Sequence, residues 1–384
     1  MLTCIFRGMN GKQLLHYFVL VLLLGATFGC GSAPEPEPEP EPEPMPTPAR
    51  LVPQFEVDPS WPMLPNNWVL GSVASVDVDS RDHVWVYHRP RSVDAAQQAD
   101  AAPAVLEFDS AGNFVQAWGG PAEDYDWPAN EHGIEVDDQG YVWIGGNGGD
   151  PESDDMLLKF TRDGEFVMQI GGRGTSGGNT DTANLKRPAE VAVYGDTNEV
   201  FVADGYDNRR VIVFDADSGA FKRMWGAFGN EPLEASAEQP PPDGVLGPQQ
   251  FGTVHGIEVS SDGLVYVSDR DLNRIQVFSI GGAYQTQMFV NRDANANSVA
   301  GLAFSPDEEQ RFVYVADLGN NHIHILDRQT LEVIDSFGRQ GPEPGQFGGV
   351  HHIATDSQGN LYTAEAQEGR RAQKLVLTGM VPLS

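Results

Sequence analysis

Three histidines recur at one fixed position of an internal repeat, a pattern typical of a metal site. His132, His255 and His351 each lie two residues before the first apolar residue of a repeat unit and eight residues before a turn glycine. The spacing to the glycine selects His351 rather than its neighbour His352. The same position holds alanine in the intervening units, at Ala74, Ala189 and Ala300. Three neutral imidazoles with an open fourth position form a catalytic type of divalent-metal site, most often a zinc site.

The elements that would position these histidines are the strands of the repeat itself. Each unit runs apolar-x-apolar, then a turn rich in Asp and Gly, then apolar-x-apolar, which predicts two antiparallel strands joined by a tight turn. Most units continue with a third and a fourth apolar stretch. Four short strands per unit, repeated six times, predict an all-β fold, the six-bladed β-propeller. The six hairpins span residues 76–88, 134–145, 191–204, 257–269, 302–317 and 353–365.

Such a propeller would bring the three histidines together. Alternate blades of a six-bladed ring are related by about 120°, and the histidine position opens the innermost strand of its blade. We therefore expect the three imidazoles to converge on the axis. A further strand-like segment, residues 54–58, precedes the first unit, and the last unit ends at residues 374–377. We expect this N-terminal strand to complete the last blade and close the ring, which leaves no open sheet edge.

The repeat resembles the NHL repeat, and residues 70–378 resemble the peptidyl-α-hydroxyglycine α-amidating lyase family. That family is a six-bladed NHL-type propeller whose zinc is held by three histidines on the axis. The histidines of HGIEV at 132, HGIEV at 255 and HHIAT at 351 match those ligands. The resemblance thus implies a Zn²⁺ site formed by His132, His255 and His351.

The resemblance also implies a set of catalytic residues. Tyr206 in DGYDNRR matches the family's catalytic tyrosine, and Arg89 in VYHRP and Arg270 in DRDLNRIQVF match two of its arginines. Tyr206 and Arg270 each occur in a single unit, whereas the Asp and Asn around them are shared between units.

The implied reaction acts on a small molecule or peptide with an α-hydroxyglycine-like end. Zinc binds the substrate hydroxyl, and Tyr206 takes its proton. Arg89 and Arg270 favour the ionised phenol or clamp the substrate carboxylate. Cleavage of the C–N bond then gives an amide and glyoxylate.

Two positions depart from the family pattern. The family has a methionine two residues before the third zinc histidine and a calcium-ligand aspartate directly after it. Gly349 and His352 stand at those positions here. Calcium prefers oxygen ligands, so His352 argues against a structural calcium bound in its usual form.

Composition and charge exclude several classes of protein. The chain has 384 residues with 55 acidic and 24 basic side chains, a formal charge of −31. A nucleic-acid partner is therefore not expected, because phosphate contacts need a basic face. The two cysteines, Cys4 and Cys30, precede the repeats, which excludes a disulfide framework and cysteine chemistry in the propeller. We expect a monomer.

The N-terminus predicts a lipoprotein. Residues 1–29 read as a signal peptide, whose apolar run of residues 17–29 ends on Gly29 and Cys30, as in a bacterial lipobox. Cleavage there would leave Cys30 as a lipid-modified N-terminus in a bacterial membrane. Residues 30–50, rich in Pro and Glu, would then be an extended tether to the propeller, residues 51–384. This places the protein in the bacterial cell envelope, with the outer membrane favoured.

Two other functions fit the same fold. The chain could be a non-catalytic propeller lipoprotein that binds a protein or a glycan, because propellers host many functions. It could also be another metal-dependent propeller hydrolase, such as a lactonase or esterase. Those enzymes usually hold calcium with Asp, Glu and Asn, whereas this axis offers histidine.

Overall fold

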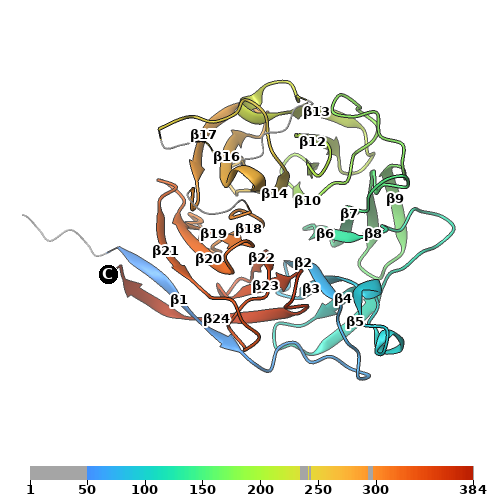
Figure 1. Cartoon of the computed structure of the whole chain (residues 1–384), viewed down its shortest axis with the longest axis vertical. Helices are drawn as coiled ribbons and strands as arrows, with labels where there is room; N and C mark the ends of the chain where they lie inside the picture. The colour runs from blue at the N-terminus through green and yellow to red at the C-terminus, as the bar shows by residue number, and fades with distance from the viewer. Residues whose placement is uncertain (1–49, 234–240, 242–243, 293–296, 384) are drawn as a thin grey trace, which may run out of the picture. The chain divides into compact units, whose positions relative to one another are not determined.

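The structure is a computed structural model that describes residues 50–233, 241, 244–292 and 297–383. Six four-stranded antiparallel sheets are arranged around a central axis (Figure 1). The predicted six-bladed β-propeller is confirmed. Cys30 and the predicted signal peptide lie outside the described residues. Among the residues that the structure does describe, no helix has the length and hydropathy to cross a membrane.

Each blade runs outward from a strand at the axis, and the innermost strands are β2, β6, β10, β14, β18 and β22 (Figure 1). The first three blades are β2 (Ser72–Val78), β3 (Val84–Arg89), β4 (Val105–Phe108), β5 (Phe114–Trp118); β6 (Glu131–Val136), β7 (Tyr141–Gly146), β8 (Met156–Thr161), β9 (Phe166–Gly171); and β10 (Glu190–Tyr194), β11 (Glu199–Asp204), β12 (Arg210–Asp215), β13 (Phe221–Trp225). The next two are β14 (Val254–Val259), β15 (Leu264–Asp269), β16 (Arg274–Ser279), β17 (Tyr284–Phe289); and β18 (Leu302–Phe304), β19 (Phe312–Asp317), β20 (His322–Asp327), β21 (Val333–Phe337). Four short 3₁₀ turns interrupt the loops, at Pro90–Ser92, Gln98–Asp100, Ala227–Gly229 and Arg270–Leu272.

The sixth blade joins the two ends of the described chain. Its strand order is β22 (Val350–Thr355), β23 (Leu361–Glu365), β24 (Ala372–Pro382) and then β1 (Leu51–Asp58). β1 pairs antiparallel with β24, from Leu51 opposite Pro382 to Asp58 opposite Lys374 (Figure 1). The predicted closure of the ring by the N-terminal strand is confirmed.

The repeated aspartate of the hairpin turn has a structural role. In blade two, Asp137 Oδ1 accepts hydrogen bonds from the backbone N–H groups of Gln139 and Tyr141, and Oδ2 accepts one from Trp143 Nε1 at 3.0 Å. Such local bonds are the reason that Asp is favoured in turns. The equivalent pair in blade one is Asp79 with Trp85, at 3.1 Å.

The hydrophobic core lies between neighbouring blades. Trp85 and Tyr87 of the first blade pack against Ile134 and Ile144 of the second, and all four are buried. Neighbouring blades thus pack face to face. This packing fixes the innermost strands in a ring and so fixes the positions of the side chains at the axis.

Candidate metal centre at the propeller axis

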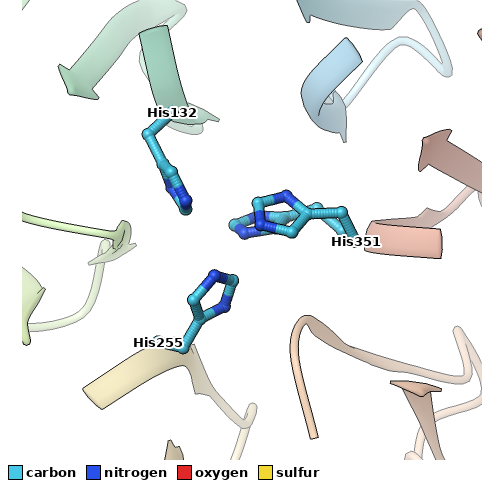
Figure 2. A group of neighbouring side chains, drawn as sticks. His132, His255 and His351 are labelled. Atoms are coloured by element: carbon cyan, nitrogen blue, oxygen red, sulfur yellow. The ribbon is translucent and has the colours of Figure 1, made fainter. Parts of the chain in front are cut away.

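Each candidate histidine lies at a β-bulge near the start of an innermost strand. In β14 the register shifts between Val254 and Gly256, which leaves His255 as an extra residue. β6 and β22 shift at the same place, at His132 and His351. A bulge re-aims the side chain of the extra residue. The three imidazoles point from three different blades toward the axis (Figure 2).

A backbone carbonyl of the next blade orients each imidazole. An Nδ1–H that donates to a carbonyl leaves Nε2 with a free lone pair, the form that binds metals. The three alanines that alternate with the histidines supply these carbonyls. The Nδ1-to-oxygen distances are 2.6 Å from His132 to Ala189, 3.3 Å from His255 to Ala300 and 2.6 Å from His351 to Ala74.

A glycine after two of the histidines makes room for these carbonyls. A Cβ on Gly133 would lie 2.5 Å from the carbonyl oxygen of Ala189, and one on Gly256 would lie 2.4 Å from that of Ala300. Such distances are well inside van der Waals contact. The glycine of the HGIEV motif is therefore explained by the orienting hydrogen bond.

The three rings meet as the sequence predicts. The ring centroids are 5.0 Å apart for His132 and His255, 4.8 Å for His132 and His351, and 4.7 Å for His255 and His351. Their possible ligand atoms, together with one of His352, all lie within 4.8 Å of one another. The Nε2 atom of His255 is buried and has no hydrogen-bond partner among the described residues. A buried lone pair of this kind among converging imidazoles fits a bound transition-metal ion.

Burial keeps these rings neutral and ready to bind a metal. The pKa of His132, of His255 and of His351 is lowered well below the usual value, mainly because burial disfavours the charged imidazolium. Neighbouring charge adds to this, most strongly from Arg270 at His255 and from His351 at His132. A metal therefore competes with few protons at this site.

Tyr206 lies directly beside the histidines. Its Oη atom is 2.8 Å from His132 Nε2, and its ring centroid is 5.8 Å from that of His255. Tyr206 comes from the loop after β11, at the end of the propeller where the innermost strands begin. The preceding Gly205 allows this position, because a Cβ there would lie 2.0 Å from the carbonyl oxygen of Val254.

The structure places the two predicted arginines differently. Arg270 Nη1 donates to Tyr206 Oη at 3.1 Å, and the guanidinium also faces the Tyr206 ring, 5.1 Å from its centroid. Burial alone would lower the pKa of Arg270, but the attraction of Tyr206 and Asp271 outweighs burial and raises it. Arg89 instead donates from Nε to the backbone carbonyl of Glu131, directly before His132, at 2.8 Å. Arg89 is close enough for its charge to help lower the pKa of His132, but no direct bond to Tyr206 is seen.

One arginine of this site was not predicted from the sequence. Arg187 lies over the Tyr206 ring, 5.4 Å from its centroid, and its backbone carbonyl accepts the Tyr206 N–H at 3.4 Å. A usable signal exists in the repeat, because Arg187 stands two residues before the His/Ala position. The other five units have uncharged residues there, namely Ser72, Asn130, Thr253, Ser298 and Gly349.

His352, at the position of the family's calcium ligand, also belongs to the histidine cluster. It is fully buried, and its Nδ1 lies 2.6 Å from Glu190 Oε1 and 3.0 Å from Ser75 Oγ. Position 352 therefore presents an imidazole nitrogen to the axis rather than a carboxylate oxygen. The sequence interpretation gave His352 no role as a ligand.

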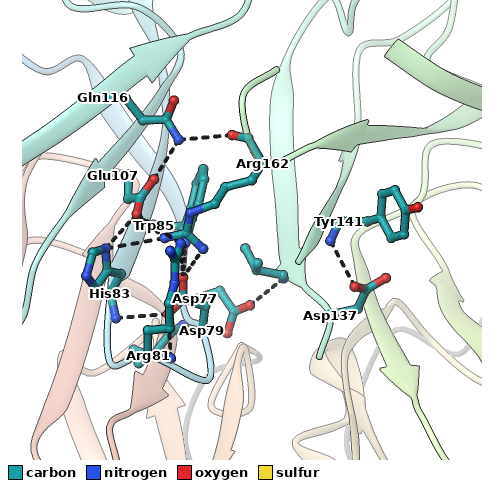
Figure 3. A network of polar contacts seen from close by, with 12 residues as sticks. Asp77, Asp79, Arg81, His83, Trp85, Glu107, Gln116, Asp137, Tyr141 and Arg162 are labelled. Atoms are coloured by element: carbon teal, nitrogen blue, oxygen red, sulfur yellow. Dashed lines mark hydrogen bonds and ion pairs between the residues drawn. The ribbon is translucent and has the colours of Figure 1, made fainter. Parts of the chain in front are cut away.

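A second group of potential ligands, Asp79, His83 and Glu107, forms an ion-pair network instead (Figure 3). Arg162 from the second blade bonds to both carboxylates, and Arg81 lies 3.6 Å from each. The two guanidinium groups thus supply the positive charge that these carboxylates would otherwise take from a cation. This network joins blades one and two and is not a metal site.

Comparison with known proteins gives distant similarities. No family model matches the chain. The chain is 25% identical over 396 residues to peptidyl-alpha-hydroxyglycine alpha-amidating lyase 1 of Drosophila melanogaster, which covers 93% of this chain but 66% of that protein. It is 28% identical over 279 residues to NHL repeat-containing protein 3 of Mus musculus, which covers 71% of this chain and 70% of that protein. The chain spans only 29% of the peptidyl-glycine alpha-amidating monooxygenase of Mus musculus, at 25% identity over 77% of this chain.

Solved structures support the fold. A streptogramin B lyase structure superposes with a TM-score of 0.52 at 12% identity, over 84% of this chain and 98% of that one. The virginiamycin B lyase of Staphylococcus aureus superposes with a TM-score of 0.51 at 14% identity, over 84% of this chain and all of that one. The protein is thus a six-bladed propeller distantly related to amidating lyases and NHL-repeat proteins, with a buried histidine cluster able to hold a metal.

Proposed function

We propose that the protein is a zinc-dependent lyase that cleaves the C–N bond of an α-hydroxyglycine-type substrate, releasing an amide and glyoxylate. One observation carries this proposal. Three neutral imidazoles with oriented Nδ1 atoms converge beside Tyr206 Oη, which lies 2.8 Å from His132 Nε2 and 3.1 Å from Arg270 Nη1. The distant similarity to the Drosophila melanogaster amidating lyase agrees with this chemistry.

His132, His255 and His351 would hold the ion through their Nε2 atoms. When bound, zinc acts as a Lewis acid that polarises and acidifies a coordinated hydroxyl group. Tyr206 Oη then accepts the hydroxyl proton of the substrate as general base. As the C–N bond breaks, the hydroxyl carbon becomes the carbonyl of glyoxylate, and Tyr206 returns the proton to the departing nitrogen. No oxidant or water is consumed.

The arginines supply positive charge on the side of Tyr206. Arg270 stabilises negative charge on Tyr206 Oη through the 3.1 Å contact. Arg89 and Arg187 lie within the same group of side chains, and their guanidinium groups suit the carboxylate of a glycine-derived end. A substrate that lacks this carboxylate should bind more weakly.

Replacing Tyr206 by Phe tests the assignment. We expect Tyr206→Phe to keep zinc and the fold but to lower glyoxylate release from an α-hydroxyglycine-extended peptide by about 10²–10⁴-fold, since it removes the general base. Tyr194→Phe is the matched control, because the Tyr194 hydroxyl lies away from the histidines and bonds to Asp196 at the surface. Glyoxylate release by Tyr206→Phe at the wild-type rate would refute the assigned base. A wild-type protein that binds zinc but releases no glyoxylate would favour another propeller activity, such as hydrolysis.

We also propose that Cys30 anchors the protein to a bacterial membrane. The support is the sequence: an apolar run that ends on Gly29 and Cys30, followed by a Pro/Glu tether. Cys30→Ser should move the protein from the membrane fraction to the soluble fraction without changing its thermal unfolding, because the propeller begins at Leu51. Retention of Cys30→Ser in the membrane fraction would exclude this anchor.

A further inference from the structure

The residue directly after the His/Ala position of the repeat is glycine in three blades and polar in the other three. Glycine stands there in units two, four and five, at Gly133, Gly256 and Gly301. Units one, three and six carry Ser75, Glu190 and His352 instead. These three polar residues meet at the axis, because Ser75 Oγ lies 3.0 Å and Glu190 Oε1 lies 2.6 Å from His352 Nδ1. Two of these departures, Ser75 and Glu190, thus converge on the imidazole of the third, His352.

The contacts of His352 are those of a metal-binding histidine. A ligand imidazole commonly donates its second N–H to a carboxylate, which fixes the tautomer and the ring orientation. Glu190 is in position to accept this bond from Nδ1, and its Oε2 is itself held by the N–H of Ile257 at 2.9 Å. The Nε2 atom of His352 is buried and has no hydrogen-bond partner among the described residues.

The other imidazoles surround this free nitrogen. The His352 ring centroid is 4.5 Å from that of His351, 5.5 Å from that of His132 and 5.3 Å from that of His255. One ligand atom of each of the four lies within 4.8 Å of the others.

We infer that His352 would be a fourth ligand of the metal, oriented by Glu190 and Ser75. This inference rests on the metal site of the proposed function. His352 follows His351 in β22 and so lies deeper in the propeller, away from the end at which β22 begins. Tyr206 lies at the other end, where the innermost strands begin. With four imidazoles at the ion, a substrate oxygen beside Tyr206 would be a fifth ligand, a coordination number that zinc sites can reach.

The alternative is that Glu190 and His352 only tie blades three and six together across the axis. The two roles differ in their effect on the metal. If the pair is purely structural, substitutions at His352 and Glu190 will lower the stability of the protein but will leave its Zn²⁺ affinity and the number of metal ligands unchanged. If His352 is a ligand that Glu190 orients, these substitutions will weaken Zn²⁺ binding, and loss of His352 will remove one ligand.

The test uses the full chain, stripped of metal and reloaded with Zn²⁺ or Co²⁺. X-ray absorption of the Co²⁺ form should show four imidazole ligands in the wild type and three in His352→Gln. A competition titration with a chromophoric chelator should show weaker Zn²⁺ binding by His352→Gln. Glu190→Gln keeps the ligand but loses the carboxylate, and it should bind Zn²⁺ about 10- to 100-fold more weakly.

Glu258→Gln is the matched control for the carboxylate. Glu258 also comes from an innermost strand, but it makes no described contact with His352, so its Zn²⁺ affinity should stay within about threefold of the wild type. Circular dichroism confirms that each variant is folded, and Glu190→Gln keeps the test decisive if His352→Gln fails to fold.

The outcomes separate the two proposals. Three imidazoles in the wild type, or wild-type Zn²⁺ affinity in both His352→Gln and Glu190→Gln, would overturn the role of His352 and leave the lyase proposal intact. A four-imidazole site without glyoxylate release would overturn the lyase proposal and support His352. A wild-type protein that binds no metal would overturn both.

Discussion

At the scale of single residues, the site depends on atoms that the motif does not display. The repeat shows the histidines, but the group that fixes each ring is the backbone carbonyl of an alanine in the next blade. Every residue has a backbone carbonyl, so the sequence does not show which carbonyls orient the histidines. The sequence shows only the residues that accompany this arrangement, namely the small residues that alternate with the histidines and the glycines after His132 and His255.

Substituting those glycines tests the orienting role of the carbonyls. In Gly133→Ala or Gly256→Ala the new Cβ would displace the carbonyl that holds the imidazole, at 2.5 Å and 2.4 Å respectively. We expect Zn²⁺ affinity to fall about 10- to 100-fold, as for loss of other groups that orient a metal ligand. A chelator competition titration measures the change.

Gly145→Ala is the control for this prediction. Gly145 lies in the strand next to His132, but a Cβ there would meet nothing nearer than 3.5 Å. Its Zn²⁺ affinity should match the wild type. Equal affinities in Gly133→Ala, Gly256→Ala and Gly145→Ala would show that the carbonyls do not control the ligands.

At the scale of elements, the innermost strands carry carboxylates as well as histidines. Asp77 Oδ2 accepts the N–H of Val136 in the next blade at 2.6 Å, and Glu190 accepts that of Ile257 at 2.9 Å. Glu135 makes the same bond to the next blade, to Val193, at 3.2 Å. These acids link neighbouring innermost strands by hydrogen bonds, further along the strands than the histidine positions.

The burial of these acids in the propeller should make its stability depend on pH. Burial raises the pKa of Asp77 to about 7. The backbone hydrogen bonds from Val136 and Val78 lower this pKa, and the nearby negative charges of Asp79 and Glu190 raise it further. Glu135 and Glu258 likewise have pKa values raised well above the usual range, mainly by burial. The folded state thus binds a proton at Asp77 that the unfolded chain releases at its ordinary pKa near ~4. Stability contributed by this group is lost as the pH rises from about 4 to about 7.

Asp77→Asn should remove this penalty. We expect the variant to raise the melting temperature relative to wild type at pH 8 more than at pH 5, because at pH 5 Asp77 is already neutral. Thermal unfolding in the presence of a chelator keeps metal binding out of the comparison. Asp138→Asn, at an exposed turn position, is the control, and it should shift the melting temperature at pH 5 and at pH 8 by the same amount. A difference between Asp77→Asn and wild type that is the same at both pH values would contradict the raised pKa.

The repeat explains why the strands were predictable and part of the site was not. Period-two alternation and the turn aspartates specify each hairpin locally, so the blades follow from the sequence. His132, His255 and His351 were predictable because the ring symmetry converts one repeat position into one place in space. Arg187, Glu190 and His352 join the site by deviating from the repeat, so a search for shared positions passes over them. The contacts of Arg270 with Tyr206, and of Arg89 with the backbone instead, depend on loop geometry that the repeat does not set.

At the scale of the whole molecule, the axial histidines lie in a ring that is closed by both ends of the described chain. His351 and His352 belong to the sixth blade, which is completed by β1 from the other end of the described chain. His351 also takes its orienting carbonyl from Ala74 in the first blade, at 2.6 Å. The junction between the last and first blades is therefore part of the candidate metal centre, and we expect closure to couple the N-terminal strand to metal binding.

Removing β1 tests this coupling. A chain that begins at Pro59 lacks the whole strand, including buried Val52 and partly buried Phe55. The Phe55 ring stacks on Phe337, with centroids 5.4 Å apart, and meets Tyr314 edge-on at 5.8 Å. Val52 is buried, whereas Phe55 and Val57 are partly buried. Their loss should lower the free energy of unfolding by about 3–6 kcal/mol, taking roughly 1.5–3 kcal/mol for a fully buried apolar side chain and about half of that for each partly buried one. The exposed edge of β24 should also promote association.

A chain that begins at Arg50 is the control, since it retains all of β1. It should match the full chain in urea unfolding and in Zn²⁺ stoichiometry, whereas the chain from Pro59 should unfold at lower urea concentration and bind Zn²⁺ more weakly. The weaker binding follows because a loosened sixth blade no longer holds His351 against Ala74. Unchanged Zn²⁺ affinity in a destabilised chain from Pro59 would show that the axis keeps its geometry without a closed ring, and that the first and last blades meet at the metal without depending on β1.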